Sequence, residues 1–423
     1  MSAGAEEELG EALAEAWRAE APYVVAALLR RHGDLGDCED AAQEAAEAAA
    51  RQWPVDGVPR DPRAWFVRVA SRRLIDRVRA ESARTRRETE EHARLAHRTE
   101  PADAGAQGGD ADELLRMLFL CCHPALSRPS QVALSLRAVA GRGVEEIATA
   151  FAVPARTVSQ RLTRARARLR EVGARFEMPT SEDLPARVGA VLDTCYVIFT
   201  EGYLRSSGRD LLDTALVDEA IRLTRRLRAA IPDHDEVAGA LALMLLLHAR
   251  TGARTDAAGD LVTLADQDRA RWTPELISEG RALVEEVLPR GPVGRYQLEA
   301  AIAAVHADAR TYEQTDWKQI CLLYAYLGAV APSPTVTLNH AVAMAMAYGP
   351  AVGLRMTEPL ATDRATARTH HLCAVRGHLF EQLGDRRAAA EQYAIAARLT
   401  TSIPEQRYLN RRLRALEDAA AQG

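Results

Sequence analysis

The chain has 423 residues, a formal net charge of −5, 48% hydrophobic residues and only 5% aromatic residues. This length predicts roughly two or three domains, and a charged content of 27% is ordinary for a protein with buried cores. Because the net charge is negative, contact with nucleic acid over the whole surface is excluded, and any such contact has to come from local basic patches.

The composition also predicts the fold class. Ala, Leu, Arg and Glu dominate, and these residues favour helices, so we expect an all-α protein. No run of about eighteen apolar residues predicts a membrane span, and the acidic start MSAGAEEELGEALAEAW does not resemble a signal peptide. We therefore expect a cytoplasmic protein. The six cysteines lie in apolar stretches without CxxC spacing and are expected to be reduced and buried.

Residues from about 10 to 85 are predicted to form helices. An apolar stripe near residues 23–29 marks the first, and the acidic segment DCEDAAQEAAEAAARQW marks the second. Its acidic start is favourable at the positive end of the helix dipole. The turn PVDGVPRDP breaks this helix. Asp61 is expected to cap the next one, with Pro62 in its first position and arginines along one side.

The segment from about 88 to 112 changes character. It is acidic, contains Gly, Ala and Pro, and has few apolar residues. Such a segment cannot bury enough apolar surface to fold alone, so we predict a flexible linker.

A helix-turn-helix is predicted within residues 113–173, where helical periodicity returns. In VEEIATAFAVPARTVSQRL, small Ala148 allows two helices to cross closely, and the turn ending at Pro154 starts the second helix at about Ala155. That helix is expected to present a set of polar and basic side chains outward. The set is Arg156, Thr157, Ser159, Gln160, Arg161 and Arg164.

Residues from about 185 to 417 are predicted to be helical again, with breaks at roughly helix-pair spacing. The best match to a repeat of about 34 residues, the tetratricopeptide length, begins near His370. Its small and bulky positions are Gly377, Phe380, Gly384, Ala389, Tyr393 and Ala396. A weaker match follows Pro332, and none is convincing before residue 310. Stacked helix pairs of this kind form a curved layered array.

Two arginine-rich blocks interrupt the otherwise acidic chain. Residues 60–87 carry ten arginines against three acids, and residues 154–175 carry seven against one. Neutralisation of phosphates by such patches supplies most of the affinity for DNA. The alternative is that both blocks are solvated faces of amphipathic helices.

Three segments in this order resemble the extracytoplasmic-function (ECF) group of bacterial RNA polymerase sigma factors. GDLGDCEDAAQEAAEAAARQW resembles region 2.2, PRAWFVRVASRRLIDRVRAESAR regions 2.3 to 2.4, and GVEEIATAFAVPARTVSQRLTRARARLRE region 4.2. FLCCHPALS and the long extension, with GYLRSSGRD, DQDRARW and APSPTVTLNHAVA, resemble a subgroup with a repeat-like extension. The resemblance implies region 2 at 10–87, a linker at 88–112, region 4 at 113–175 and a tetratricopeptide-like extension at 185–417.

The resemblance also implies roles for individual residues. Docking on the β′ clamp helices of the polymerase would use Asp40, Gln43 and Glu44, although the same acids suit an ordinary solvated face. The −10 element would meet Trp65, Arg68, Arg72, Arg73, Asp76 and Arg79. Trp65 also suits the core, and Arg72 stands where the family usually has Asn, so only a phosphate contact is carried over to it. The −35 element would meet the outward set on the second helix of the helix-turn-helix.

The implied function is that of a sigma factor, which binds core polymerase through the β′ clamp helices and the β flap and directs it to promoter DNA. It needs no cofactor, metal or covalent step. We expect the extension to contact region 2, region 4 or the linker and to regulate activity. The alternatives are a stand-alone helix-turn-helix regulator with a ligand- or protein-sensing repeat domain, and a repeat scaffold whose basic helices are only solvated.

Clusters that suit enzymes are weak in this sequence. Cys121, Cys122 and His123 are adjacent on a helix and point different ways, which favours a core role. The pair His370–His371 is expected to lack a carboxylate partner. The motif at 266–272 suits either a ligand site or, preferably, a salt-bridged turn between helices.

Overall fold

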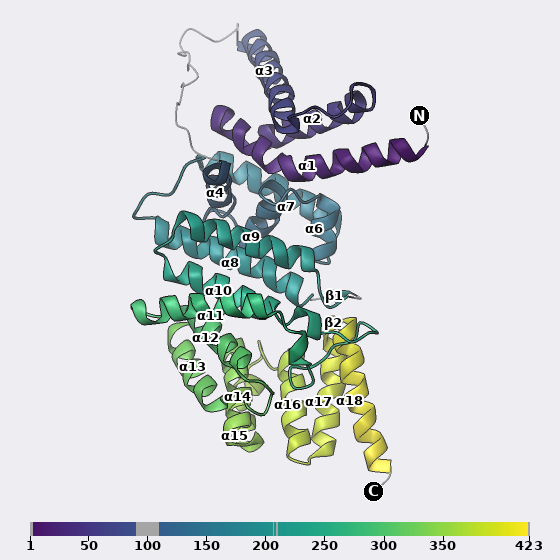
Figure 1. Ribbon diagram of the computed structural model, residues 1–423, viewed down its shortest axis with the longest axis vertical. Helices are drawn as coiled ribbons and strands as arrows, with labels where there is room; N and C mark the ends of the chain where they lie inside the picture. The colour runs from purple at the N-terminus through teal and green to yellow at the C-terminus, as the bar shows by residue number, and fades with distance from the viewer. Residues whose placement is uncertain (1–2, 90–109, 206, 209, 422–423) are drawn as a thin grey trace. The chain divides into compact units, whose positions relative to one another are not determined.

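The computed structural model describes residues 3–89, 110–205, 207–208 and 210–421, and its described part is almost entirely helical (Figure 1). The described residues form eighteen α-helices and one two-residue parallel strand pair, β1 (Ser207–Gly208) with β2 (Thr401–Ser402). The expected all-α fold is therefore confirmed. The chain divides into two compact units: residues 1–149 with 153–194, and residues 150–152 with 195–423.

Three helices open the first unit: α1 (Ala3–His32), α2 (Leu35–Asp56) and α3 (Pro62–Thr89). They pack around a buried aromatic cluster in which the ring of Phe66 lies 5.1 Å from those of both Trp17 and Trp53. As expected, Asp61 caps α3, accepting a 2.9 Å hydrogen bond from the backbone amide of Ala64. The bundle thus fixes one face of α3 and leaves the arginines of the other face outward.

Four shorter helices follow: α4 (Asp110–Cys121), α5 (Arg128–Ala138), α6 (Val144–Ala150) and α7 (Ala155–Glu171). The turn before α7 places Ala152 at φ 47°, and α7 begins at Ala155 as the sequence predicts. Ala148 is buried, which matches the small side chain expected at the helix crossing. The expected linker at 88–112 lies mostly outside the described residues.

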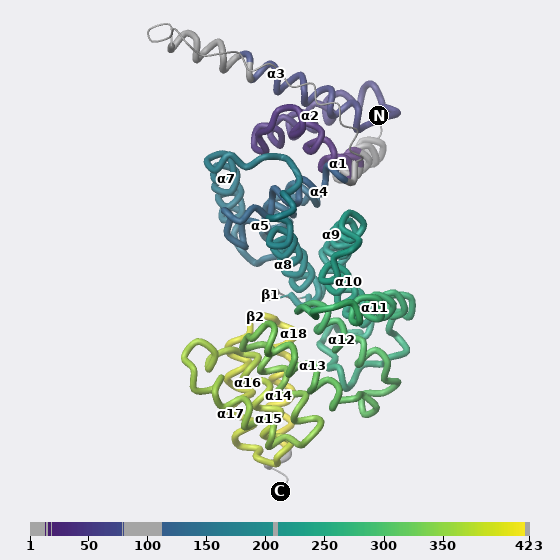
Figure 2. The backbone as a smooth tube through the Cα atoms, turned by 90° about the vertical axis from the view of Figure 1, so that its left-hand side faces the viewer, coloured from purple at the N-terminus to yellow at the C-terminus, as the bar shows by residue number. Residues whose placement is uncertain are grey.

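The second unit contains the C-terminal part of α8 (Leu184–Tyr203), from Cys195 onward, and all later helices. These are α9 (Thr214–Ala230), α10 (Asp235–His248), α11 (Pro274–Val287), α12 (Arg295–Asp308), α13 (Trp317–Val330), α14 (Pro334–Tyr348), α15 (Pro350–Thr362), α16 (His370–Gln382), α17 (Arg386–Leu399) and α18 (Ile403–Ala421). Each helix from α9 to α18 packs on the next one in the chain, and α10 also packs directly on α12 (Figure 2). Short 3-10 turns lie at Thr251–Ala253, Arg269–Arg271 and Leu288–Arg290.

The α16–α17 pair shows how the expected repeat positions are used. A Cβ atom on Gly377 would lie 2.8 Å from the ring of Tyr393, so only glycine allows this close packing. Gly384 forms the turn at φ 80°, and Ala389 and Ala396 are buried beside Tyr393. The residues of the sequence pattern therefore lie at the contact between the two helices.

Two further expectations concern the chain as a whole. All six cysteines are free and buried, as expected. Among the helices that the structure describes, none is both long and apolar enough to cross a membrane.

Candidate nucleic-acid and polymerase interfaces

A groove of about 840 Å³ runs between α1 and α3 in the first unit. Arginines from both helices line it, with only Asp61 and Asp76 as acidic residues. The lining arginines are Arg30, Arg31, Arg63, Arg68, Arg72 and Arg79. This concentration of positive charge in a concave surface suits a phosphate backbone.

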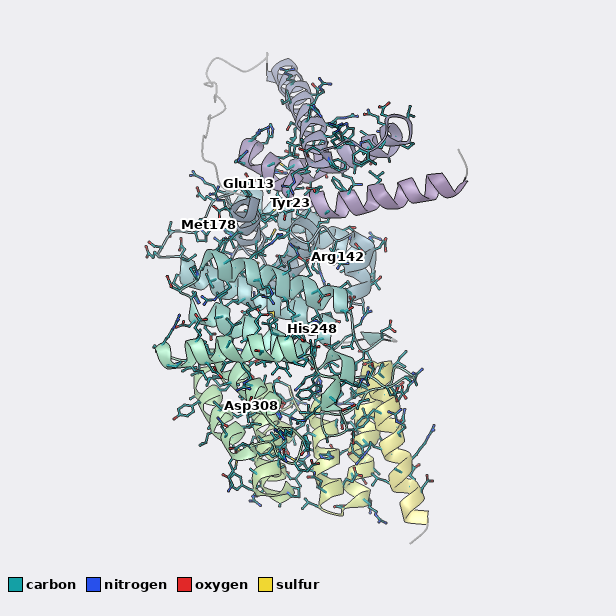
Figure 3. All side chains as sticks on the ribbon, in the orientation of Figure 1. Tyr23, Glu113, Arg142, Met178, His248 and Asp308 are labelled. Atoms are coloured by element: carbon teal, nitrogen blue, oxygen red, sulfur yellow. The ribbon has the colours of Figure 1, made fainter. Side chains whose placement is uncertain are left out.

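Four of the residues assigned to the −10 element from the sequence line this groove together: Arg68, Arg72, Asp76 and Arg79. Sequence reasoning missed Arg30, Arg31 and Arg63, although the basic end of the first helix was a usable signal. Arg63 is held in place by Glu20, with Nε 2.5 Å from Oε2, and by the ring of Tyr23 on α1, labelled in Figure 3, whose centroid is 4.1 Å away. Its guanidinium is therefore positioned before any ligand arrives.

The structure does not bring Trp65 and Arg73 into the groove. Trp65 is half-buried and packs edge-on against Trp53 at 5.5 Å and against Phe66 at 5.5 Å. Arg73 turns toward α2, where its Nε lies 3.9 Å from a carboxylate oxygen of Glu44. Trp65 thus contacts the aromatic cluster but is only half-buried, which leaves both interpretations of the sequence open.

The acidic face of α2 is partly neutralised from within the bundle. Asp40 and Gln43 are exposed, whereas Glu44 is half-buried and accepts a hydrogen bond from Nη2 of Arg77. The other terminal nitrogen of Arg77 lies 3.8 Å from Asp40. Asp40 and Gln43 therefore remain accessible to a partner, while Glu44 is held by α3.

The N-terminal half of α7 carries the residues assigned to the −35 element. Arg156, Ser159, Gln160 and Arg164 are exposed, and Thr157 and Arg161 are half-buried. The opposite face is buried through Val158, Leu162, Ala165 and Leu169. No side chain caps the first turn, where the amides of Thr157 and Val158 donate to the carbonyl of Pro154. The positive end of the helix dipole lies here and favours an anion. The geometry suits insertion of this helix end into a DNA groove.

The C-terminal half of α7 faces α2 instead. Arg166 donates from Nε to Glu39 at 2.7 Å, and Glu39 is only 6% exposed. Arg137 on α5 lies 3.9 Å from the same carboxylate. Burial raises the pKa of Glu39, and the two arginines oppose that shift.

A second ion pair joins the same helices nearer the surface. Arg170 donates to both carboxylate oxygens of Asp34, at 2.7 and 3.1 Å. This hydrogen bonding holds the pKa of Asp34 below its usual value. Sequence reasoning missed these pairs because their members lie more than 120 residues apart.

The structure shows the contacts of two clusters that the sequence suggested as possible sites, the cysteine pair at 121–122 and the motif at 266–272. The Cys122 thiol lies 3.6 Å from the Ser135 hydroxyl, and burial raises the pKa of both Cys121 and Cys122. Such thiols are poor nucleophiles. In the motif at 266–272, Arg269 donates to the backbone carbonyls of His306 and Ala309 and lies 4.7 Å from the ring of Trp272.

The expectation that His370–His371 lacks a carboxylate partner is wrong. Glu405 on α18 lies 3.4 Å from Nε2 of His370, and ligand atoms of all three residues lie within 4.8 Å of one another. The three could hold a metal ion, but Glu405 already accepts a 2.7 Å hydrogen bond from Thr400. The sequence could not reveal this contact because tertiary folding brings α18 to α16.

Comparison with known families and proteins matches these segments. Residues 5–84 match Sigma-70 region 2, residues 116–169 match Sigma-70, region 4, and residues 187–288 match a family of unknown function, DUF6596. No solved structure matches the chain.

Two relatives define the similarity further. An uncharacterized protein of Rhizobium meliloti (strain 1021) is 40% identical over 400 residues, which cover 93% of each chain. The probable ECF RNA polymerase sigma factor SigI of Mycobacterium tuberculosis (strain ATCC 25618 / H37Rv) is 31% identical over 159 residues, 37% of this chain and 53% of that protein. The chain therefore belongs to the ECF sigma factors and carries an additional DUF6596 region beyond region 4.

Proposed function

We propose that the protein binds core RNA polymerase and directs it to specific promoters, and that its extension regulates this activity. The observation that carries the proposal is the pairing of two separate basic surfaces, the α1–α3 groove and the N-terminal half of α7, within segments that match sigma regions 2 and 4. Each surface alone would bind DNA weakly. When core polymerase fixes their spacing, binding of DNA at one surface raises the effective concentration of DNA at the other.

The groove is the proposed site of the −10 strand. Arg68, Arg72 and Arg79 contact phosphates, joined by Arg63 from the start of α3. Trp65 does not line the groove, and we assign it a supporting role, since its ring packs against Trp53 and Phe66. Arg73 bridges to α2, so it links the DNA site to the polymerase site.

The −35 duplex is proposed to bind residues 156–164 of α7. Thr157, Ser159 and Gln160 have the short polar side chains that read base edges, and Arg156, Arg161 and Arg164 can reach phosphates or guanine.

Core polymerase is proposed to bind both regions. Asp40, Gln43 and Glu44 on α2 form the contact with the β′ clamp helices, and region 4 forms the contact with the β flap. Asp40 and Gln43 support this because they are exposed on the same face. Replacing all three by alanine is expected to abolish polymerase binding, whereas a stand-alone regulator would keep its full activity.

The working division is region 2 at 10–87, linker at 88–112, region 4 at 113–175 and extension at 185–417. Regulation by the extension is supported by its size. A truncation after Thr194 tests this role best, because it keeps the first unit whole. Within that unit Arg187 donates to the carbonyl of Phe119, and Arg128 donates to Asp193. Unchanged promoter-directed transcription by residues 1–194 would contradict a regulatory role.

The decisive experiment is transcription in vitro with bacterial core polymerase and DNA from upstream of the protein's own gene. A discrete transcript start that depends on the protein supports the proposal. Absence of both a transcript and co-elution with core polymerase overturns it in favour of the stand-alone regulator.

A further inference from the structure

A cavity of about 850 Å³ lies inside the second unit and is separate from the surfaces described above. Its walls come from α8, α10, α12, α13 and α14 and the segments between them. This volume falls within the range of small-molecule sites, roughly 300–1,000 Å³. The last residues of α10 and α12, His248 and Asp308, are labelled in Figure 3. Two polar residues of the cavity, Arg250 and His306, lie within two residues of these helix ends.

Aromatic rings make up much of the wall. Tyr312 and His306 both pack edge-on against Trp317, with ring centroids 5.3 and 5.2 Å away. Tyr196 on α8 and Tyr324 on α13 also line the cavity. Flat π-systems favour offset or edge-on contact with another ring, so this wall suits an aromatic ligand.

The charges in the wall do not cancel. Arg295 donates to Glu299 at 2.8 Å, and Glu299 also accepts from the hydroxyl of Tyr196 at 3.2 Å, so this pair is neutral overall. Arg250 donates to the hydroxyl of Tyr203 at 2.9 Å and pairs with no carboxylate in the described part of the chain. One positive charge therefore remains in the cavity wall.

Two nitrogen atoms of the wall residues are buried without a hydrogen-bond partner among the described residues: Nε of Arg250 and Nδ1 of His306. Buried polar atoms are rarely left unpaired, because each lost hydrogen bond costs about 1–3 kcal/mol. Burial, together with the nearby charges of Arg250 and Arg269, lowers the pKa of His306 to about 3. The imidazole is thus neutral at pH 7 in a positive field that attracts an anion.

We infer that this cavity binds a small aromatic monocarboxylate. The carboxylate pairs with Arg250 near His306, and the ring lies against Trp317, Tyr312 and Tyr324. The single unpaired charge of Arg250 indicates a ligand with one negative charge. The aromatic residues of the wall indicate that the rest of the ligand is an aromatic ring. This binding site is independent of the proposed promoter function, since it needs neither polymerase nor DNA.

The probe for the test is 2-naphthoate, with the neutral isostere 2-naphthamide as the comparison. Calorimetry on the full chain at pH 7 is expected to show saturable binding of naphthoate, with a dissociation constant of about 1 mM or lower. Naphthamide is expected to bind at least about tenfold more weakly because it lacks the charge that faces Arg250. No saturable binding of naphthoate, or equal binding of the two compounds, would overturn the inference.

A fluorine label on the tryptophans locates the bound probe. Only Trp317 of the five tryptophans lines the cavity, so its ¹⁹F resonance, assigned with Trp317→Phe, should shift on adding naphthoate. The resonances of Trp17, Trp53 and Trp65 should stay in place. A shift at those three alone would contradict the assigned site.

Two variants complete the test. Arg250→Gln should weaken naphthoate at least about tenfold, whereas Arg225→Gln, which removes an exposed arginine paired with Glu279, should leave binding unchanged. Arg250 also holds Tyr203, so a second variant guards against misfolding. Asn339 is exposed at the cavity wall, and Asn339→Trp should block binding by filling the space. Full binding by a folded Asn339→Trp protein would overturn the assignment.

Discussion

Burial decides the ionisation of individual side chains in the second unit, and His306 is the clearest case. Its Nδ1 has no partner in the described residues, its ring packs on Trp317, and Arg250 and Arg269 add positive potential. Burial, the largest cause, and the charges of the two arginines disfavour the protonated ring. The folded protein therefore keeps His306 neutral at acidities where an unfolded chain would protonate it.

This difference predicts a loss of stability in acid. The pKa of His306 is about 3 in the folded state against 6.5 in the unfolded chain. Its contribution is fully present above pH 6.5 and is lost as the pH falls toward 3, by about 3 kcal/mol at pH 4.5. Urea unfolding at pH 7 and 4.5 should show a smaller pH dependence in His306→Gln than in the parent protein. The same pH dependence in both proteins would contradict the shift.

At the scale of single helices, stability depends on how closely neighbouring helices pack. Two glycines show the contrast. Gly377 on α16 faces the ring of Tyr393 on α17, whereas Gly328 on α13 has nothing within 4 Å of a Cβ atom built on it. The same chemical change at the two positions should therefore have opposite effects.

Gly377→Ala is expected to destabilise the second unit by about 1–3 kcal/mol, because the new methyl group forces Tyr393 from its place. Gly328→Ala should stabilise it by about 0.5–1 kcal/mol through helix propensity. Thermal unfolding followed by circular dichroism gives both signs. Destabilisation by Gly328→Ala of the same size as by Gly377→Ala would show that the α16–α17 contact is not the cause.

Helix α7 allows a matched test of the proposed promoter contact. Arg164 is exposed on the outward face, while the exposed Arg168 is paired with Glu171 at 2.8 Å. If Arg164 contacts phosphate, Arg164→Ala should weaken binding of holoenzyme to −35 DNA at every sequence and reduce the salt slope by about 1. Arg168→Ala is the control and should change neither quantity. Equal effects of the two substitutions, measured by fluorescence anisotropy over a salt series, would count against the assigned face.

At the scale of the whole molecule, the sequence predicts features set by neighbouring residues but not contacts between helices that are distant in the chain. The cap at Asp61 and the start of α7 at Ala155 follow from neighbouring residues, so both were predictable. Glu39 with Arg166 and Glu405 with His370 depend on helices that meet only after folding, and periodicity carries no information about such partners. The cavity was missed for the same reason, because five helices contribute to it.

The ion pairs between α2 and α7 predict how the two halves of the first unit respond to charge removal. Glu39 with Arg166 and Asp34 with Arg170 join helices whose paired residues lie 127 and 136 positions apart in the chain. Their loss in the double variant Asp34→Asn/Glu39→Gln should lengthen the distance between α2 and α7. The buried pair contributes more than the exposed one, since solvent screens Arg170.

Single-molecule energy transfer measures this distance. Dyes can be attached at Glu47→Cys on α2 and Ala167→Cys on α7, both exposed, because all six native cysteines are buried and react slowly. The double variant should show lower transfer efficiency, and 1 M salt should shift the parent protein in the same direction, as screening over about 3 Å weakens the exposed pair. Glu145→Gln removes an exposed charge on α6 and should leave the efficiency unchanged. Equal efficiencies in the parent and the double variant would mean that apolar packing, rather than these ion pairs, holds α7 against α2.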